Sequence, residues 1–415
     1  MLNKDGNREL AYIVAIDEIK PIPNYDKVEH ARVGGWWVIV RKDQFQVGDL
    51  AIYIEVDAKV PEEEPFMFLE KRHFKVKTLK MCKVLSQGLL MSPEDFGWTQ
   101  DTSGQSAGDS PRIKVNKEKY FIEGDFVTEF LKITYAEIED NNRKAASADK
   151  YKLMAQRHGK LFSKKPIRWL MKRKWGRKLL FIFFGKKKDK KNGWPVWVVK
   201  TDEERCQNMS WLFPGNDEEW IATEKIDGTS TTFTMKGFGR EREFYICSRN
   251  VVFDTPSKKC YYETNVYTEM AEKYSIKEVL ARLMDTVDPI TYQPINPVYV
   301  TIQGETYGEG IQKRTYGLEG HDFMAFNLIF GMPDGRAWRL NPVEMTQMLQ
   351  NFNIPCVPII DEHFKIPATC EELLQIASGN SVIDGGMREG LVFRSKCGTR
   401  SFKAVSNDFL LKYHS

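Results

Sequence analysis

Short runs of β-branched and aromatic residues fill the first 138 positions and constrain the fold more than any other feature. Such runs lie at residues 11–16, 36–40 and 50–54, and turn-forming Pro, Gly, Asn and Asp separate them at 21–24, 34–35 and 47–49. Short strands with turn signals at this spacing are typical of a small barrel. We therefore predict an all-β barrel domain at 1–138. Its Trp36, Trp37 and Phe45 have two open roles, in the core or as a platform for bases.

A strongly basic segment follows the predicted barrel. The 415 residues carry 61 Lys and Arg against 57 Asp and Glu, a formal net charge of +4. Residues 150–191 hold 17 of these bases and one acid, Asp189, which leaves 44 bases and 56 acids elsewhere. We place a basic insertion or linker at 139–195. Residues 196–415, which mix strand-like and helix-like runs, then form a larger domain, so that the whole chain is α+β.

Three interpretations of the basic segment remain open. Its Lys and Arg residues alternate with Trp169, Trp175 and several phenylalanines, and such segments bind nucleic acid through phosphate charge and base stacking. A basic amphipathic segment also binds anionic membrane surfaces. The third interpretation is a solvated insertion without a partner.

The remaining bulk features exclude several classes of protein. Seven scattered cysteines without a C-x-x-C pair are neither a disulfide framework nor a zinc ribbon, and they favour a reducing compartment. The six histidines form no metal-binding spacing. The longest apolar run, 179–184, is far shorter than a membrane span. We expect an intracellular, cytoplasmic protein, with the nucleus as an alternative, and no signal peptide.

The most informative stretch is 220–230, where an apolar strand ends at Lys225 and Asp227-Gly228 turns the chain. A lysine at the mouth of a pocket becomes a nucleophile when its surroundings lower its pKa. The K-x-D-G pattern alone is weak, because a chain of this length meets it by chance roughly one time in ten. An ordinary surface lysine is the alternative.

Five further blocks follow in a fixed order, and each combines a strand-like run with a charged or aromatic residue. These residues are Arg249, Glu305, Phe326, Glu389 and Lys403. Glutamates among apolar strands are costly to bury without a partner, which favours a functional role for Glu305 and Glu389. Phe326 has a core role as its alternative, and Arg249 an exposed position at a strand end.

The ordered set resembles the covalent nucleotidyltransferases, which include DNA ligases, RNA ligases and mRNA capping enzymes. The resemblance covers about 225–412 and is most like the RNA ligases, through 304–312 and 323–326. It implies that 196–415 is a nucleotidyltransferase (adenylation) domain of antiparallel sheets and helices, and that 1–138 is an OB-like nucleic-acid-binding domain. Residues 23–33, 45–54 and 57–61 resemble the OB module of the Deinococcus-type RNA ligases, and 197–208 resembles the block before the nucleophile in that group. The same block offers a purely structural alternative, in which Thr201 and Glu204 form a capping box that opens a helix.

The resemblance implies a role for each matched residue. Lys225 would be the nucleophile that forms lysyl-AMP from ATP, and Lys403 would contact the α-phosphate. Glu224 would border the adenine pocket and Phe326 would stack on adenine. Arg249 and Glu305 would hold the ribose, and Glu389 would organise Mg²⁺ or Mn²⁺ through water. Neighbouring cations would help to keep Lys225 neutral.

The sequence departs from the family pattern at three places. Ser401 and Val405 flank Lys403 at the positions where a second lysine is common, and Lys412 lies far from them. Asn327 stands where an aspartate is common, and Ser230 where an asparagine is often found. These departures leave the second phosphate-binding lysine unidentified.

The leading hypothesis is an ATP-dependent RNA ligase for RNA repair that seals 3′-hydroxyl and 5′-phosphate ends, as at nicks in RNA-containing duplexes. A capping-type guanylyltransferase and a non-catalytic RNA-binding protein are the alternatives. We expect the chain to act as a monomer on RNA or RNA-containing duplex ends, without stable insertion into a membrane.

Overall fold

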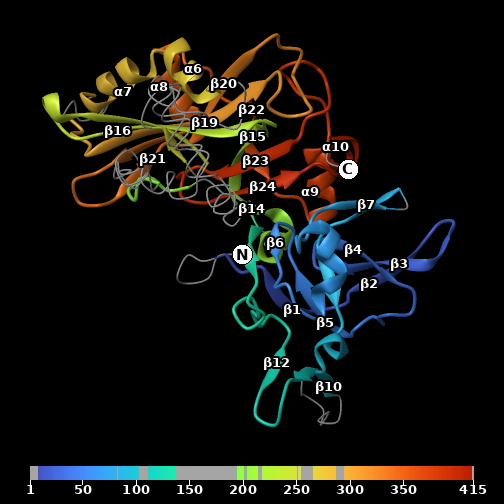
Figure 1. Ribbon diagram of the computed structural model, residues 1–415. Helices are drawn as coiled ribbons and strands as arrows, with labels where there is room; N and C mark the ends of the chain where they lie inside the picture. Colours follow the sequence, from blue (N-terminus) through green and yellow to red (C-terminus); the bar gives the residue numbers. More distant parts are fainter. Residues whose placement is uncertain are drawn as a thin grey trace, which may run out of the picture.

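The computed structural model describes residues 8–81, 83–101, 111–136, 194–200, 203–213, 217–249, 251–253, 265–286 and 294–413. Figure 1 shows two bodies, one built from the described residues up to 136 and one from the described residues from 203 onward. The predicted basic segment at 150–191 lies outside the described residues. The boundaries predicted at 138 and 195 also fall within or next to undescribed residues.

The first body consists of short strands and two 3-10 helices. Its strands form five small sheets within the described residues, with the orders β1-β5-β9, β2-β3-β4, β6-β13, β7-β8 and β10-β11-β12. The strands are β1 (Ala11–Ala15), β2 (Glu18–Ile22), β3 (Tyr25–Val33), β4 (Trp36–Arg41), β5 (Leu50–Ile54), β6 (Ala58–Lys59), β7 (Leu79–Met81), β8 (Val84–Ser86), β9 (Leu89–Met91), β10 (Thr99–Asp101), β11 (Arg112–Lys114), β12 (Tyr120–Ile122) and β13 (Thr134–Tyr135). The 3-10 helices are η1 (Phe66–Arg72) and η2 (Pro93–Phe96).

Strand β5 lies at the centre of this body. All five of its residues are buried, because alternate side chains point to opposite faces of a strand and each face meets its own core. Leu50, Ile52 and Ile54 enter one apolar cluster. Ala51 and Tyr53 enter a second, which β4 also lines.

The three aromatic residues with open roles divide between core and surface. Trp36 and Phe45 are buried in the second cluster and so belong to the core. Trp37 is only partly buried, on the outer face of β4. His30 lies 4.7 Å from its ring centre, and the Lys20 amine lies 4.6 Å above the ring.

The second body contains two sheets with helices packed against them. The six-stranded sheet has the order β18-β17-β16-β19-β20-β21, and the five-stranded sheet has the order β14-β24-β23-β15-β22. Their strands are β14 (Glu204–Arg205), β15 (Glu219–Lys225), β16 (Thr229–Lys236), β17 (Glu243–Ser248), β18 (Val252–Phe253), β19 (Tyr299–Gly308), β20 (His321–Gly331), β21 (Ala337–Arg339), β22 (Ile359–Lys365), β23 (Gly390–Ser395) and β24 (Ser401–Val405).

Helices α6 (Val266–Lys273), α7 (Ile276–Met284) and α8 (Pro342–Gln350) share a core with the six-stranded sheet. Helix α9 (Cys370–Ala377) packs on the five-stranded sheet. The second body also contains the short 3-10 helices η3 (Cys206–Asn208), η4 (Ser210–Leu212) and η5 (Gly239–Glu241). The α+β class predicted from the sequence, with an all-β first domain, is confirmed.

Two local expectations differ from the structure. Glu204 starts strand β14 and not the first turn of an α-helix, so the capping-box interpretation is wrong; Thr201 itself lies outside the described residues. Strand β14 also pairs in parallel with β24, whereas we predicted antiparallel sheets. In both cases pairing with a strand some 200 residues away overrides the local pattern.

Contacts between the two bodies fix their arrangement. Helix α10 (Asn407–Tyr413) follows β24 and joins a small apolar cluster of Leu85, Val405 and Leu410. The Lys80 amine donates to the Leu411 carbonyl at 3.3 Å. In Figure 1, α10 and α9 accordingly lie beside β7 of the first body.

Candidate active site

Strand β15 positions Lys225 at its carboxyl end. Trp220 to Glu224 are buried, which makes the strand a rigid support, and Lys225 emerges where it ends. The Asp227 backbone N–H donates to the Tyr316 hydroxyl at 2.7 Å. At Gly228 a Cβ atom would lie 2.4 Å from the Thr306 carbonyl oxygen, so only glycine fits the corner between β15 and β16.

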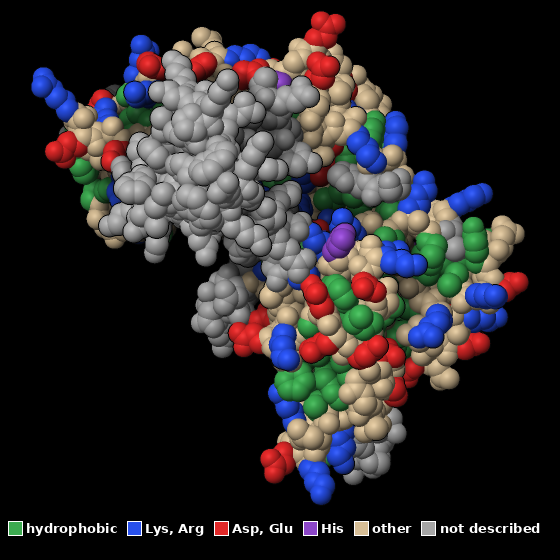
Figure 2. Space-filling model, in the orientation of Figure 1, with side chains coloured by type: hydrophobic (Ala, Val, Ile, Leu, Met, Phe, Trp, Pro, Cys, Tyr) green, Lys and Arg blue, Asp and Glu red, His purple; other side chains and the backbone are tan. Residues whose placement is uncertain are grey.

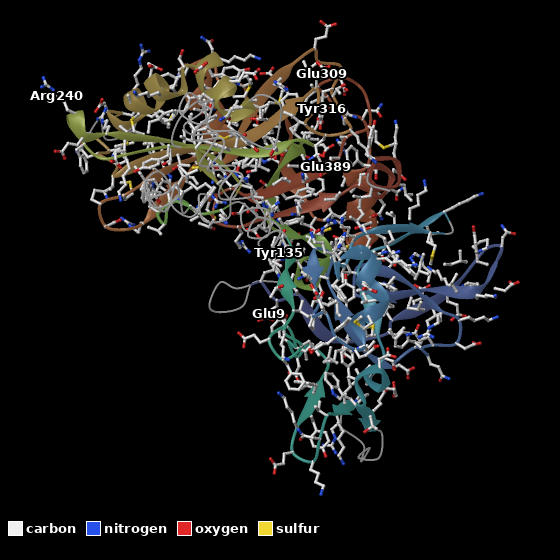
Figure 3. The ribbon with its side chains drawn as sticks, in the orientation of Figure 1. Glu9, Tyr135, Arg240, Glu309, Tyr316 and Glu389 are labelled. Carbon is white, nitrogen blue, oxygen red and sulfur yellow. The ribbon has the colours of Figure 1, made fainter. Side chains whose placement is uncertain are left out.

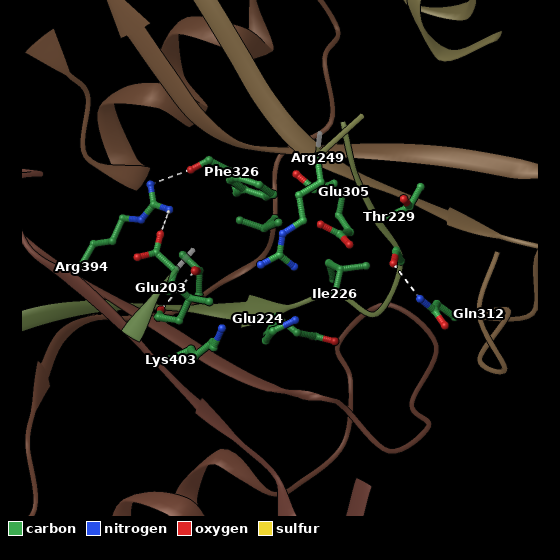
Figure 4. Close-up of a pocket in the computed structure, with 16 residues that line it drawn as sticks. Glu203, Glu224, Ile226, Thr229, Arg249, Glu305, Gln312, Phe326, Arg394 and Lys403 are labelled. Carbon is green, nitrogen blue, oxygen red and sulfur yellow. Dashed lines mark hydrogen bonds and ion pairs between the residues drawn. The ribbon is translucent and has the colours of Figure 1, made fainter. Parts of the chain in front are cut away.

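A cavity of about 300 Å³, lined by apolar and polar side chains, opens beside Lys225 between the two sheets (Figure 4). This volume lies at the lower end of the range for small-molecule sites. The lining residues are Glu203, Thr223, Glu224, Lys225, Ile226, Gly228, Thr229, Ser230, Arg249, Glu305, Gln312, Phe326, Val357, Val392, Arg394 and Lys403. The structure thus brings together six of the seven predicted site residues.

Glu389 is the seventh, and it lies next to Lys225. Its Oε2 atom accepts from the Lys225 amine at 2.7 Å. The contact follows from strand pairing, because Lys225 is opposite Gly390, the first residue of β23. Figure 3 shows Glu389 in the second body, on the side that faces the first.

The surroundings of Lys225 are acidic. Burial by itself would lower the pKa of the Lys225 amine, but the carboxylates of Glu389, Glu305 and Asp227 outweigh burial and raise that pKa above its ordinary value. The expectation that neighbouring cations lower this pKa is therefore wrong. In this state the lysine is an ammonium group, and it needs to lose its proton before it attacks a phosphate.

Burial raises the pKa of two of these acids. Burial raises the pKa of Glu305 to about 8, with Lys225 opposing and Glu389 adding to the shift. Burial, together with the charge of Glu389, raises the pKa of Asp227 to about 7. Close acids in a buried site disfavour one another's ionisation, so a bound cation would stabilise this cluster.

Arg249 and Glu305 line one part of the cavity. Glu305 is opposite Ser230 in the pairing of β19 with β16. Arg249 follows β17, and its side chain extends into the cavity in Figure 4, with Phe326 and Glu305 at either side. A guanidinium beside a carboxyl group is suited to hold the hydroxyls of a sugar, because one donates and the other accepts.

Phe326 is partly buried: it packs against a small apolar cluster and also lines the cavity, so it combines both predicted positions. Its backbone carbonyl accepts from Arg394 Nη1 at 2.7 Å. Burial lowers the pKa of the Arg394 guanidinium, and Glu203 counters that effect from 3.1 Å. Arg394 also donates to the Asn327 side chain.

Sequence reasoning missed Glu203 and Arg394 as members of this site. Glu203 is an acid within the block at 197–208. Arg394 is a base in the strand-like run that begins at Gly390. Neither position carries a signal of its own, because the pair is 191 residues apart in the chain. Ser401 also donates to Glu203, which ties the block to β24.

Lys403 lies on β24, opposite Val392 of β23, and lines the cavity together with Val392. Lys412, on α10, does not line it. Glu224 lines the cavity as well, and its Oε2 accepts from the Val382 N–H at 3.0 Å. Its Oε1 is buried and has no hydrogen-bond partner among the described residues, which fits a donor group of a ligand.

Asn208 links strand β14, the neighbour of β24, to the first body. Its amide nitrogen donates to Glu55 at 2.8 Å and to Glu204 at 2.6 Å. Its amide oxygen accepts from the Trp36 indole at 2.7 Å. Asn208, the last residue of the block at 197–208, therefore joins the two bodies, a role that the sequence did not indicate.

The donor set is suited to a loosely held divalent cation. Within the described ranges, no group of three or more His, Cys, Asp or Glu side chains is placed to hold a metal ion. The single carboxylate of Glu389 already pairs with one cation, the Lys225 ammonium. One or two carboxylates with water and substrate phosphates is the usual way in which proteins bind Mg²⁺.

Family models match both parts of the chain. A model described as an OB-fold domain matches residues 10–93, and a model described as RNA ligase matches residues 218–414. A search of curated proteins finds no match. No helix within the described parts of the chain is long and apolar enough to cross a membrane.

Solved structures of a Naegleria gruberi RNA ligase are similar over nearly the whole chain. The complex with pyrophosphate is 23% identical, with a TM-score of 0.64 and coverage of 98% of this chain and 99% of that one. A variant with ATP and Mn is 25% identical, with a TM-score of 0.64 and coverage of 98% and 100%. A variant with AMP and Mn is 24% identical, with a TM-score of 0.63 and coverage of 98% and 99%. Residues 218–414 thus form an RNA ligase domain, and an OB-fold domain at residues 10–93 precedes it.

Proposed function

We propose that this protein is an ATP-dependent RNA ligase that joins a 3′-hydroxyl end to a 5′-phosphate end, as at a nick in an RNA-containing duplex. The observation that carries the proposal is the position of Lys225, at the edge of a cavity that six predicted nucleotide-binding residues line. The compared Naegleria ligase, in complexes with ATP and Mn and with AMP and Mn, supports ATP as the nucleotide.

The proposed reaction has three steps. The neutral Lys225 amine attacks the α-phosphate of ATP, a P–N bond forms and pyrophosphate leaves. The 5′-phosphate of the polynucleotide then attacks lysyl-AMP, and AMP passes to that end. Finally the 3′-hydroxyl attacks the activated 5′-phosphate, the phosphodiester bond forms and AMP leaves.

Each part of the cavity has a role in this reaction. Phe326 would stack on the adenine, and the unpaired Oε1 of Glu224 would accept from its amino group. Arg249 and Glu305 would hold the ribose, and Lys403 would neutralise the α-phosphate. Mg²⁺ or Mn²⁺, held by Glu389 through water, would supply charge neutralisation, the main requirement of phosphoryl transfer.

Glu389 would have a second role in the first step. While it pairs with Lys225, it keeps the amine protonated. If Glu389 held a divalent cation, the Lys225 ammonium would lose its principal partner, and the pKa of the amine would fall toward the operating range.

The decisive experiment measures nucleotide transfer to the protein. Incubation with α-labelled ATP and Mn²⁺ should label wild type through an acid-labile, base-stable P–N bond. Lys225→Ala should abolish the label, while Lys277→Ala, at an exposed position of α7, should retain it. Label from GTP alone would favour the capping-type alternative, and RNA binding without label would favour the non-catalytic one.

A second assay addresses the substrate. Nicked duplexes with RNA or DNA placed independently on each side of the nick should be sealed only when RNA occupies at least one defined position, because the 2′-hydroxyl is the group that distinguishes the two. Equal sealing of all-DNA nicks would contradict the RNA assignment. Within this proposal the protein acts as a monomer in the cytoplasm, and the nucleus is the alternative.

A further inference from the structure

One residue of the first body contacts a residue that lines the cavity of the second body. Tyr135 is the last residue of β13, which pairs with β6 of the same body. Arg249 Nη2 donates to the Tyr135 hydroxyl oxygen at 3.3 Å, although the two residues are 114 positions apart. Arg249 itself lines the cavity. Figure 3 shows Tyr135 at the boundary between the two bodies.

Tyr135 is held by other residues of the first body. The Arg8 guanidinium lies 5.1 Å from the centre of its ring, a distance suited to a cation–π contact. Arg8 in turn lies 3.6 Å from the buried Glu55 carboxylate. The Tyr135 ring therefore has a defined position before any nucleotide binds.

The same carboxylate is tied to the second body. Glu55 Oε1 accepts from Asn208, which also bonds Glu204 at the start of β14. A continuous set of contacts thus runs from the strand that flanks β24, through Asn208, Glu55 and Arg8, to Tyr135 and then Arg249. The position of the OB-fold domain and the orientation of a cavity-lining guanidinium are parts of one arrangement.

The chemistry of this contact suits a positioning role. A guanidinium has several N–H donors in a fixed plane, and it has no acceptor. When one of them donates to the Tyr135 oxygen, the contact restricts the orientation of the Arg249 guanidinium plane. Pre-setting a long side chain in this way reduces the entropy that is lost when ligand binds.

We propose that Tyr135 is a positioning residue for nucleotide binding, through which the OB-fold domain orients Arg249 toward the ribose of ATP. This inference rests on the proposed ATP-dependent activity. It assigns the OB-fold domain a part in the first step of the reaction, in addition to any contact with RNA.

The test compares the kinetics of lysyl-AMP formation in wild type and Tyr135→Phe. The variant removes only the acceptor oxygen and keeps the ring against Arg8. We expect the KM for ATP to rise about fivefold with kcat changed less than about twofold, because one hydrogen bond to a charged group is lost outside the reacting atoms. Tyr120→Phe, at an exposed tyrosine of β12, is the matched control and should leave both constants unchanged.

A double-mutant cycle identifies the route of the effect. In an Arg249→Met background, Tyr135→Phe should raise the KM no further, because the guanidinium that it orients is gone. Arg8→Met removes the cation–π contact with the Tyr135 ring and should also raise the KM for ATP. It replaces Tyr135→Phe as the test variant if Tyr135→Phe does not fold.

The outcomes are distinguishable. If wild type forms no lysyl-AMP, the proposed function fails and this inference fails with it. If wild type is active and neither Tyr135→Phe nor Arg8→Met alters the KM for ATP, the inference alone is overturned. A fall in kcat and in the unfolding temperature at constant KM would also overturn it, since that pattern marks a purely structural residue.

Discussion

The Lys225 amine lies among three acidic side chains, and this arrangement sets the electrostatics of the site. Its ion pair with Glu389 joins residues 164 positions apart. The elevated pKa values of Glu305 and Asp227 have burial as their main cause. At the residue scale, repulsion from Glu389 adds to this effect of burial, and a cation at Glu389 would relieve that repulsion.

Glu305→Gln should stabilise the protein at alkaline pH and have little effect at acidic pH, when both are measured without nucleotide or metal ion. The pKa of Glu305 in the folded protein, about 8, is above its value in an unfolded chain. The folded state thus keeps a proton that the unfolded chain loses, so wild-type stability falls as pH rises from about 4 to about 8. Gln does not titrate and avoids this loss. We expect a gain on the order of 2 kcal/mol at pH 8.5.

Urea unfolding at pH 5.5 and pH 8.5 measures this difference in the free energy of unfolding. Glu319→Gln, at an exposed position, is the control and should show no such dependence on pH. An equal effect of Glu305→Gln at both pH values would contradict the prediction.

The buried Arg394 guanidinium donates to the side chain of Asn327, which stands where an aspartate is common in the related RNA ligases. An asparagine supplies no negative charge to this guanidinium. The buried guanidinium takes its carboxylate from Glu203 instead. Glu203→Gln should therefore cost about 3 kcal/mol in the free energy of unfolding, as expected when a buried charge loses its partner. Asn327→Asp in that background should recover much of the loss, since it returns a carboxylate to Arg394.

Urea unfolding of the two single variants and the double variant tests this compensation. Asn327→Asp alone should give no comparable gain, because Glu203 already pairs with Arg394 and the new acid would face the Gln303 side-chain oxygen. If the double variant loses as much free energy of unfolding as the two single variants together, Glu203 and residue 327 do not both neutralise Arg394.

At the scale of elements, the corner between β15 and β16 fixes the position of Lys225 relative to β19. Strand β15 belongs to the five-stranded sheet and β16 to the six-stranded one, so this corner joins the two walls of the cavity. The sequence predicted a turn at Asp227-Gly228. It did not show that the turn presses against Thr306 of another strand.

Gly228→Ala should destabilise the protein and displace Lys225. Its Cβ atom would lie 2.4 Å from a backbone oxygen of Thr306 and 2.8 Å from the Glu305 side chain. Overpacking of this kind costs about 2 kcal/mol or more, because backbone cannot move aside cheaply. Gly386→Ala is the control, since its nearest contact is the end of the Arg314 side chain at 3.0 Å. Gly228→Ala should lower both the unfolding temperature and the labelling of the protein by ATP, and Gly386→Ala should change both less.

At the scale of the whole molecule, the charge of the chain is divided between distinct segments. Residues 150–191 carry most of the excess positive charge, and the remainder of the chain is acidic. An acidic ligase that holds polyanionic RNA has to offset repulsion at long range. The basic segment, which lies outside the described residues, is the part of the sequence that can supply this attraction.

Deleting 150–191 should flatten the dependence of RNA affinity on salt while lysyl-AMP formation continues. Each phosphate that the protein neutralises contributes about 0.7 to 0.9 to the slope of log affinity against log salt concentration. Filter binding or fluorescence anisotropy between 50 and 300 mM salt, roughly the range over which this slope is measured, gives the comparison. A version of the segment with Gln at the basic positions separates charge from length. An unchanged slope would refute a role in binding RNA.

The sequence alone predicted the order of the domains, the fold class and the residue types of the candidate site. Strand alternation and turn residues are local signals, so the short runs of the first 138 residues were readable without a structure. Lys225, Glu305, Phe326 and Lys403 each lie on or at the end of a strand-like run, which is why their order along the chain could indicate a shared pocket.

Only the tertiary structure decided which of these groups act on one another. The parallel pairing of β14 with β24, the Glu203–Arg394 ion pair and the contact of Tyr135 with Arg249 all join distant parts of the chain. The same is true of the acids that raise the pKa of Lys225, where cationic neighbours had been expected. Local sequence encodes backbone preference and burial, whereas electrostatic energy depends on distances that only the folded chain sets.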